Sequence, residues 1–258
     1  QRNAAGHWEQ GETGGKFHGG DTGLALLALL YAGENPLSEE LNRSLRWLAD
    51  RPLDQTYTIG TRAHVLALVP GRTYRRQLQA DLDWLVRNIN PHDSPMPGAY
   101  YYDAYTGGRA SYDNSNSQYG VLGVWMATDA ALTVPASYWE LVSGHWMRDQ
   151  NGDGGWGYTG SSGGEGASTG SMTAAGLATL YVVLDRLYVD RPRDAVEIVG
   201  GIDRALEWFA REFTTENPRG AAEWKYYYLY GIERVGRASG KKYFRDLDWF
   251  RVGAAELL

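Results

Sequence analysis

The segment from Asp113 to Gln118 carries the densest group of side chains that could bind a ligand or do chemistry. Its six residues are Asp, Asn, Ser, Asn, Ser and Gln, and an apolar stretch follows directly. Asp113 is expected at the start of a helix, where it would accept hydrogen bonds from unpaired backbone N–H groups. A carboxylate with several such bonds has a lowered pKa, which suits a nucleophile or an electrostatic role better than a general acid.

We therefore take Asp113 as a candidate catalytic residue, and Asn114, Asn116 and Gln118 as candidate ligand contacts. The alternative is simple capping of the helix, which is worth about 1 kcal/mol. His64 is a second candidate for acid–base chemistry, because it lies within an apolar helix expected to face inward. A hydrogen-bonded core histidine is the alternative for His64, and His145 is expected to serve in packing.

Aromatic residues are a third group of candidates, since the chain has 18 Tyr and 10 Trp but only 5 Phe. Rings with one polar edge suit half-wet surfaces that stack on sugars or hold cations. The alternative is that they fill gaps between helices. The candidate ligand contacts of this kind are Tyr57, Trp125, Trp156, Tyr158, Trp224 and Tyr227.

No metal site or cofactor is predicted. The pattern Asp149-Gln-Asn151-Gly-Asp153-Gly154 imitates the start of a calcium loop, but Gly160 stands where the closing Glu would be. A turn rich in Asn and Asp is the alternative. The chain has no cysteine, which excludes thiolate zinc sites and Cys nucleophiles and leaves the compartment undecided.

Composition and charge narrow the class of protein. With 258 residues and 43% hydrophobic content the chain can bury a large core, and we expect one domain over residues 1–258. A net charge of −6 argues against nucleic-acid binding. The longest apolar run, Leu24 to Ala32, is shorter than the roughly 18 residues of a membrane span, so a soluble chain is predicted. The helical pattern at 248–258 has no closing cap, which suggests further domains in a longer parent chain.

Apolar and amphipathic segments alternate along the chain. Asp21, Asp54, Asp113 and Ser168 or Thr169 are the expected N-caps of the apolar segments. A helix that is apolar all round is covered on both faces, so five such hairpins favour two concentric layers. The predicted fold is an all-α, α/α toroid with parallel inner helices wrapped by outer ones, and an open helical solenoid is the alternative. The five expected pairs are 21–31 with 38–50, 54–69 with 73–89, 113–132 with 135–148, 168–187 with 194–213, and 221–235 with 242–258.

Two motifs carry a family resemblance. Gln150, Gly154 and Trp156 form the pattern Gln-x-x-x-Gly-x-Trp, which Gln10 and Gly14 repeat with Lys16 in place of Trp. The run Asp113-x-Ser115-x-x-Gln118 is similar to the start of an inner helix in the same family. The chain thus resembles the squalene cyclase and protein prenyltransferase β-subunit superfamily, whose toroids usually have six hairpins around a central cavity.

The resemblance does not bring an activity with it. Class II cyclases use an Asp-x-Asp-Asp acid, whereas Asp81-Leu-Asp83-Trp84 and Asp246-Leu-Asp248-Trp249 both lack the last Asp and are expected on outer helices. The prenyltransferase zinc site needs a Cys. Two hypotheses remain: a ligand-binding or scaffolding toroid of an uncharacterised branch, or an enzyme acting on an isoprenoid or a glycan in the central cavity. The polar residues at 112–118 fit a glycan at least as well as an isoprenoid.

Overall fold

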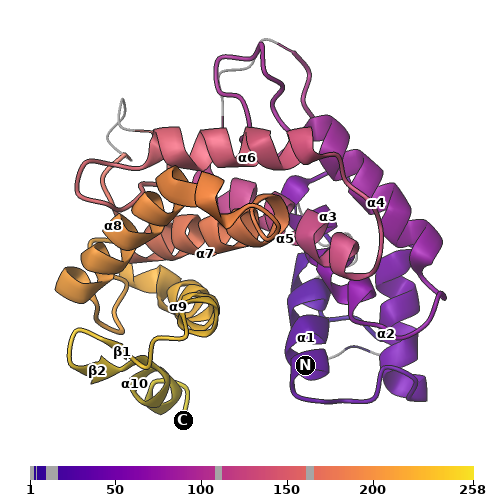
Figure 1. Ribbon diagram of the computed structural model, residues 1–258. Helices are drawn as coiled ribbons and strands as arrows, with labels where there is room; N and C mark the ends of the chain where they lie inside the picture. Colours follow the sequence, from indigo (N-terminus) through magenta and orange to yellow (C-terminus); the bar gives the residue numbers. More distant parts are fainter. Residues whose placement is uncertain (1–2, 4, 10–16, 108–111, 161–165) are drawn as a thin grey trace. The chain divides into compact units, whose positions relative to one another are not determined.

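The computed structural model describes residues 3, 5–9, 17–107, 112–160 and 166–258. Its described residues form ten α-helices and one short hairpin, which confirms the all-α prediction (Figure 1). The chain divides into two compact units, which are described separately. The first comprises Gln1–Asn90, Tyr100–Ser111 and Tyr119–Pro135, and the second comprises Pro91–Ala99, Tyr112–Gln118 and Ala136–Leu258. The prediction of a single domain stays a prediction.

The first unit is built around one buried helix. It contains α1 (Gly20–Tyr31), α2 (Glu39–Ala49), α3 (Thr56–Ala67), α4 (Arg75–Asn88) and the larger part of α5 (Asn114–Asp129). Helix α3 packs against α1, α2 and α4. It also meets α5 so closely that a Cβ atom at Gly60 would lie 2.3 Å from the carbonyl oxygen of Tyr119. Small residues at this crossing let the two backbones touch.

Burial in the first unit follows the predicted pattern in three of its helices. Helix α3 is buried along almost its whole length, whereas α2 and α4 each bury a single stripe. Helix α1 differs, because Leu24 is 41% exposed and Tyr31 is 55% exposed. The expectation that this segment is covered on every side is therefore wrong. Its contacts to α2 and α3 use one face, on which Thr22, Leu26 and Leu27 are buried.

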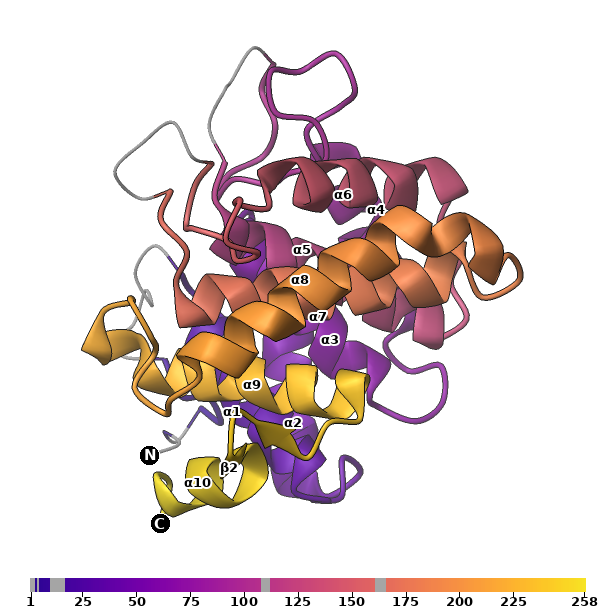
Figure 2. The ribbon, with the colours of Figure 1, turned by 60° about the vertical axis from the view of Figure 1, so that its left-hand side comes forward.

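The second unit is centred on α7. It contains α6 (Ala136–Asp149), α7 (Gly170–Leu187), α8 (Val196–Glu212) and α9 (Lys225–Ser239), with short 3₁₀ turns at Pro192–Ala195 and Ala222–Trp224. Helix α7 contacts α6, α8 and α9, and Figure 2 shows α8 and α9 running beside it. The run of small and aliphatic residues in α7 is buried over most of its length, as predicted.

The C-terminal segment corrects a prediction. Instead of one helix over 242–258, the chain forms an antiparallel hairpin of β1 (Tyr243–Phe244) and β2 (Leu247–Asp248), followed by α10 (Trp249–Ala255). Arg245 adopts φ +54°, a left-handed conformation that turns the chain. The carboxylate of Asp248 accepts the N–H of Arg251 at 3.1 Å and so begins the short helix at residue 249.

Two of the predicted N-caps are confirmed. The Oδ1 of Asp113 accepts the N–H of Asn116 at 2.7 Å at the start of α5, and the hydroxyl of Thr169 accepts the N–H of Met172 at the start of α7. Asp21 and Asp54 do not cap their helices, because α1 and α3 begin after Gly19 and Gln55 without a side-chain cap. Among the described helices, none combines the length and hydropathy needed to cross a membrane.

Candidate functional site

Asp113 lies at the start of α5 and is 1% exposed. Its two carboxylate oxygens accept the backbone N–H and the side-chain Nδ2 of Asn116 at 2.7 and 2.9 Å. Burial raises the pKa of Asp113 to about 6, and hydrogen bonds from Asn116 and Tyr158 oppose that rise. The lowered pKa expected from the sequence is therefore wrong, since the loss of hydration outweighs the hydrogen bonds.

A group of buried polar side chains lies beside it, which we call the buried cluster: Tyr112, Asn114, His145 and Asp149. The Tyr112 hydroxyl donates to Asp149, with 2.9 Å to each carboxylate oxygen. The Nδ2 of Asn114 donates to Asp149 at 3.0 Å and to the carbonyl oxygen of Gly157 at 3.0 Å. These bonds occupy the side chain of Asn114, a candidate ligand contact, with protein partners.

His145 is the member of the buried cluster whose role the sequence did not reveal. It is fully buried, and its Nε2 lies 2.8 Å from Oδ1 of Asn114. Burial lowers its pKa to about 4, so the imidazole is neutral at pH 7. Because Asn114 Oδ1 can only accept, we assign the proton to Nε2, which leaves Nδ1 as an acceptor. That atom is buried without a partner among the described residues.

The spacing of two residues could have pointed to this cluster. His145 and Asp149 are four residues apart on α6, so they lie on the same face of the helix. From the sequence, His145 is expected to serve in packing, and Asp149 is part of the calcium-like pattern.

A second group faces α9, and we call it the α5–α9 cluster: Asp113, Ser115, Asn116, Gln118, Tyr227 and Arg234. The Tyr227 hydroxyl donates to Ser115 Oγ at 3.0 Å, and Gln118 Nε2 donates to the same hydroxyl. Arg234 in turn donates to Gln118 Oε1. Asp113, Asn116 and Gln118 are buried, whereas Ser115, Tyr227 and Arg234 are only partly buried. The last three thus form the accessible side of the cluster.

Trp156 supports the packing alternative. It is fully buried, and its Nε1 donates to the carbonyl oxygen of Trp146 at 2.9 Å. Gln150 of the same motif donates through Nε2 to the carbonyl oxygens of Gly154 and Gly201, at 2.9 and 2.8 Å. The motif therefore joins the end of α6 to α8, and its Trp156 ring packs against Gly176 of α7. The related residues Gln10, Gly14 and Lys16 lie outside the described residues.

Three candidate residues belong to the first unit, namely His64, Tyr57 and Trp125. His64 is buried, and its Nε2 lies 2.8 Å from the Tyr31 hydroxyl, which supports a hydrogen-bonded core histidine. Tyr57 packs its ring edge-on against Tyr119, with 4.6 Å between ring centroids. Trp125 is partly buried in α5.

The remaining two aromatic candidates belong to the second unit. Trp224 is largely exposed just before α9. Tyr158 is partly exposed, and its hydroxyl bonds to Asp113. Tyr158 and Tyr227 thus bond through their hydroxyls to residues of the α5–α9 cluster, Tyr158 to Asp113 and Tyr227 to Ser115.

The calcium-like pattern is used for structural contacts. Asp149 turns into the buried cluster, and Asn151 Nδ2 donates to the carbonyl oxygen of Gly166 at 2.8 Å. Asp153 accepts the Ser168 hydroxyl at 2.6 Å and forms an ion pair with Arg219 at 3.1 Å. Within the described parts of the chain, no group of three His, Cys, Asp or Glu residues is arranged to hold a metal ion.

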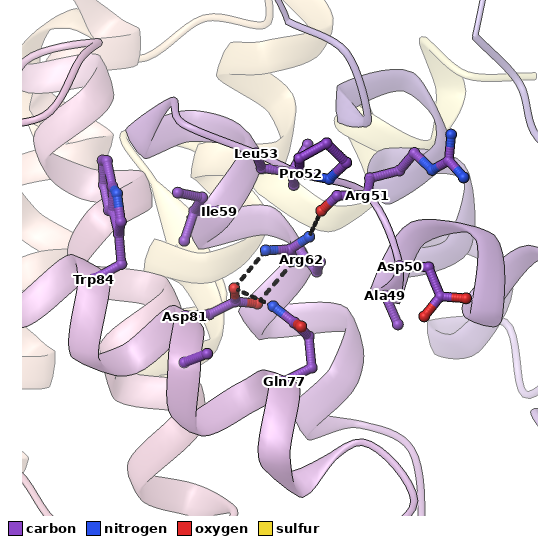
Figure 3. A pocket seen from close by; sticks show the side chains of 11 residues that line it. Ala49, Asp50, Arg51, Pro52, Leu53, Ile59, Arg62, Gln77, Asp81 and Trp84 are labelled. Carbon is purple, nitrogen blue, oxygen red and sulfur yellow. Dashed lines mark hydrogen bonds and ion pairs between the residues drawn. The ribbon is translucent and has the colours of Figure 1, made fainter.

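Asp81, from the run Asp81-Leu-Asp83-Trp84, belongs to a buried ion pair. Arg62 and Asp81 are 4% and 2% exposed and meet through two bonds of 2.9 and 2.6 Å (Figure 3). Arg62 also donates to the carbonyl oxygen of Arg51 at 2.5 Å, and Gln77 donates to Asp81 at 3.0 Å. The pair joins the end of α2 to α3 and α4, and both residues line a cavity of about 510 Å³.

The described residues thus bring five of the candidates together at the start of α5, namely Asp113, Asn114, Asn116, Gln118 and Tyr227, with Tyr158 beside Asp113. Asn114 and Asp113 are held by protein partners, and the accessible groups are hydroxyls and one guanidinium. Comparison of the chain with protein-family models, curated proteins and solved structures found no match.

Proposed function

We propose that this chain is a ligand-binding domain of the α/α-toroid type, and that it binds a polar, sugar-like molecule at the α5–α9 cluster. The toroid arrangement is supported by the alternation of buried and amphipathic helices in the pairs α3–α4 and α7–α8, and by the helix-joining role of Gln150 and Trp156. Binding is favoured over catalysis because the carboxylates of the site, Asp113 and Asp149, are both occupied by protein donors.

One observation carries the choice of ligand. Oδ1 of Asn116 is buried and has no hydrogen-bond partner among the described residues. An unsatisfied buried acceptor costs about 1–3 kcal/mol, and a hydroxyl group of a ligand would satisfy it. Ser115 and Tyr227 contribute hydroxyls to the same cluster, and both residues are partly exposed. Hydroxyl and amide groups recognise a polyhydroxylated molecule, whereas an isoprenoid needs an apolar wall.

A glycan-cleaving enzyme is a second candidate, which one observation favours. The pKa of Asp113, raised to about 6, lies in the range of carboxyl groups that act as general acids. Glycoside hydrolysis also requires a second carboxylate, as nucleophile or base, roughly 5 to 10 Å away. The nearby Asp149 is bonded to Tyr112 and Asn114, which makes it a structural carboxylate and favours binding without cleavage.

The proposal can be tested by ligand-observed NMR with neutral and acidic oligosaccharides and with farnesol. Saccharide signals should show saturation transfer from the wild type. They should show it equally from the control variant Tyr226→Phe, because the side chain of Tyr226 is exposed on α9. Tyr227→Phe removes the one hydroxyl bonded to Ser115 and Gln118, and it should weaken binding about tenfold.

Two other outcomes would contradict the proposed ligand class or favour the second candidate function. Binding of farnesol without binding of any saccharide would show that the proposed ligand class is wrong. Release of reducing ends from an oligosaccharide, lost in Asp113→Asn, would favour the glycan-cleaving enzyme.

A further inference from the structure

Arg234 is a partly buried cation with neutral partners. It donates to the amide oxygen of Gln118, and its guanidinium lies 5.0 Å from the centroid of the Tyr230 ring. Its Nε is buried without a hydrogen-bond partner among the described residues. The neighbouring carboxylate of Glu233 is paired with Arg237 at 3.1 Å. Arg234 therefore keeps unused donor capacity.

The same chain shows how a buried arginine is satisfied when its role is structural. Arg62 forms two bonds to Asp81 and donates through Nη1 to the backbone carbonyl oxygens of Leu48 and Arg51. A guanidinium offers five donors in a planar fork that matches a carboxylate or a phosphate. Arg234 has no such acidic partner within the described residues, so its guanidinium lacks an anion to which it can donate.

The surroundings of Arg234 favour an anion at that position. Tyr227, Tyr230 and Arg234 are spaced by three and four residues, so they share one face of α9. The contacts of that face with Ser115 and Gln118 bring it to the first turns of α5, where the helix dipole stabilises negative charge. Asp113 is the acidic group of the cluster, and its carboxylate is already bonded to Asn116 and Tyr158.

We infer that the ligand carries an acidic group, a carboxylate or a phosphate, and that Arg234 binds this group while Asn116 accepts a hydroxyl. The inference rests on the proposed function and narrows its ligand to an acidic sugar. Such a ligand would satisfy both atoms of the α5–α9 cluster that are buried without a hydrogen-bond partner among the described residues, the acceptor Asn116 Oδ1 and the donor Arg234 Nε. A neutral sugar would satisfy the first atom and leave the second unpaired.

The test compares glucose with two acidic derivatives that differ from it at C6, glucuronate and glucose 6-phosphate, and with inorganic phosphate. Each is titrated by calorimetry and ligand-observed NMR. We expect at least one of the two acidic sugars to bind about tenfold more tightly than glucose. Arg234→Gln should abolish that preference, and Arg234→Lys should retain part of it, because an ammonium keeps the charge without the fork. The matched control is Arg237→Gln combined with Glu233→Gln, which removes the exposed ion pair on the same helix and frees no carboxylate beside Arg234.

The outcomes separate this inference from the proposed function. If glucose binds as tightly as both acidic sugars, and Arg234→Gln changes nothing, the acidic class is wrong while sugar binding stands. If neither neutral nor acidic sugars bind at millimolar concentration, both ideas fail. If inorganic phosphate matches glucose 6-phosphate and binds equally to Arg234→Gln, the binding is unspecific and the role of Arg234 is refuted. Should Arg234→Gln not fold, Arg234→Lys and Gln118→Ala provide the same comparison.

Discussion

The Nε2 atom of His145 lies 2.8 Å from Oδ1 of Asn114, and both side chains are fully buried. Asn114 in turn donates to Asp149, so one residue of α5 connects two polar residues of α6. The backbone N–H of Asn114 also donates to the carbonyl oxygen of Tyr158 at 2.8 Å. The buried cluster thus fixes the start of α5, the segment that carries Asp113, Ser115 and Asn116.

His145 should make the protein less stable in mild acid. Its pKa is 6.5 in the unfolded chain and about 4 in the folded one, so only the unfolded state binds a proton between these values. The contribution of His145 to stability is therefore complete above pH 6.5 and is lost as the pH drops toward 4, by on the order of 3 kcal/mol. His145→Gln should remove this contribution. Urea unfolding at pH 7 and pH 5 measures it, and an unchanged difference between the two pH values would contradict the assignment.

Asp113 should have the opposite effect. Its pKa rises from 3.8 in the unfolded chain to about 6 in the folded one, so the folded state binds the proton more tightly. The contribution is most favourable below pH 3.8 and is lost as the pH rises through 6, by on the order of 3 kcal/mol. Asp113→Asn should therefore be more stable than the wild type at pH 7, because Asn also caps a helix.

Asp113→Ala serves as the control for capping, and it should lose about 1 kcal/mol relative to Asp113→Asn. If Asp113→Asn is instead destabilised at pH 7 as strongly as Asp113→Ala, the folded protein needs the ionised carboxylate. Between pH 4 and 6 the effects of His145 and Asp113 oppose each other, so each single variant should show a steeper dependence on pH than the wild type.

Gly176 should not tolerate a methyl group. A Cβ atom at this position in α7 would lie 2.4 Å from the ring of Trp156, which is fully buried. Gly176→Ala should cost about 1–3 kcal/mol by overpacking. Gly144→Ala in α6 is the control, since no atom lies within 4 Å of its added Cβ. It should stabilise the helix by roughly 0.5–1 kcal/mol. Thermal unfolding of both variants gives the comparison, and equal melting temperatures would show that Trp156 can move.

Breaking the ion pair of Arg62 and Asp81 should be costly. Arg62→Met leaves a carboxylate buried without its cation, and we expect a loss of about 3–5 kcal/mol. The double variant Arg62→Met with Asp81→Leu should recover most of that loss, because no buried charge remains. Arg43→Met, in an exposed pair with Glu39, should change stability by less than about 1 kcal/mol. A double variant less stable than Arg62→Met would contradict this account.

The sequence by itself determined most of the helices, the burial of α2, α3 and α4, and the cap at Asp113, because spacing and capping are properties of neighbouring residues. It narrowed the cap of α7 to Ser168 or Thr169, and the structure selects Thr169. It also determined that Gln150, Gly154 and Trp156 form a helix-joining turn.

Only the tertiary structure decided what surrounds each element. Leu24 is apolar, yet it is 41% exposed because the neighbouring helices cover the other face of α1. Tyr31 is 55% exposed, although its hydroxyl reaches His64 of α3. The pKa of Asp113 rises because distant segments remove water from its carboxylate, and His145 belongs to a polar cluster because Asn114 is folded against α6. Periodicity shows which face of a helix is apolar, whereas desolvation and partner choice depend on residues far away in the chain.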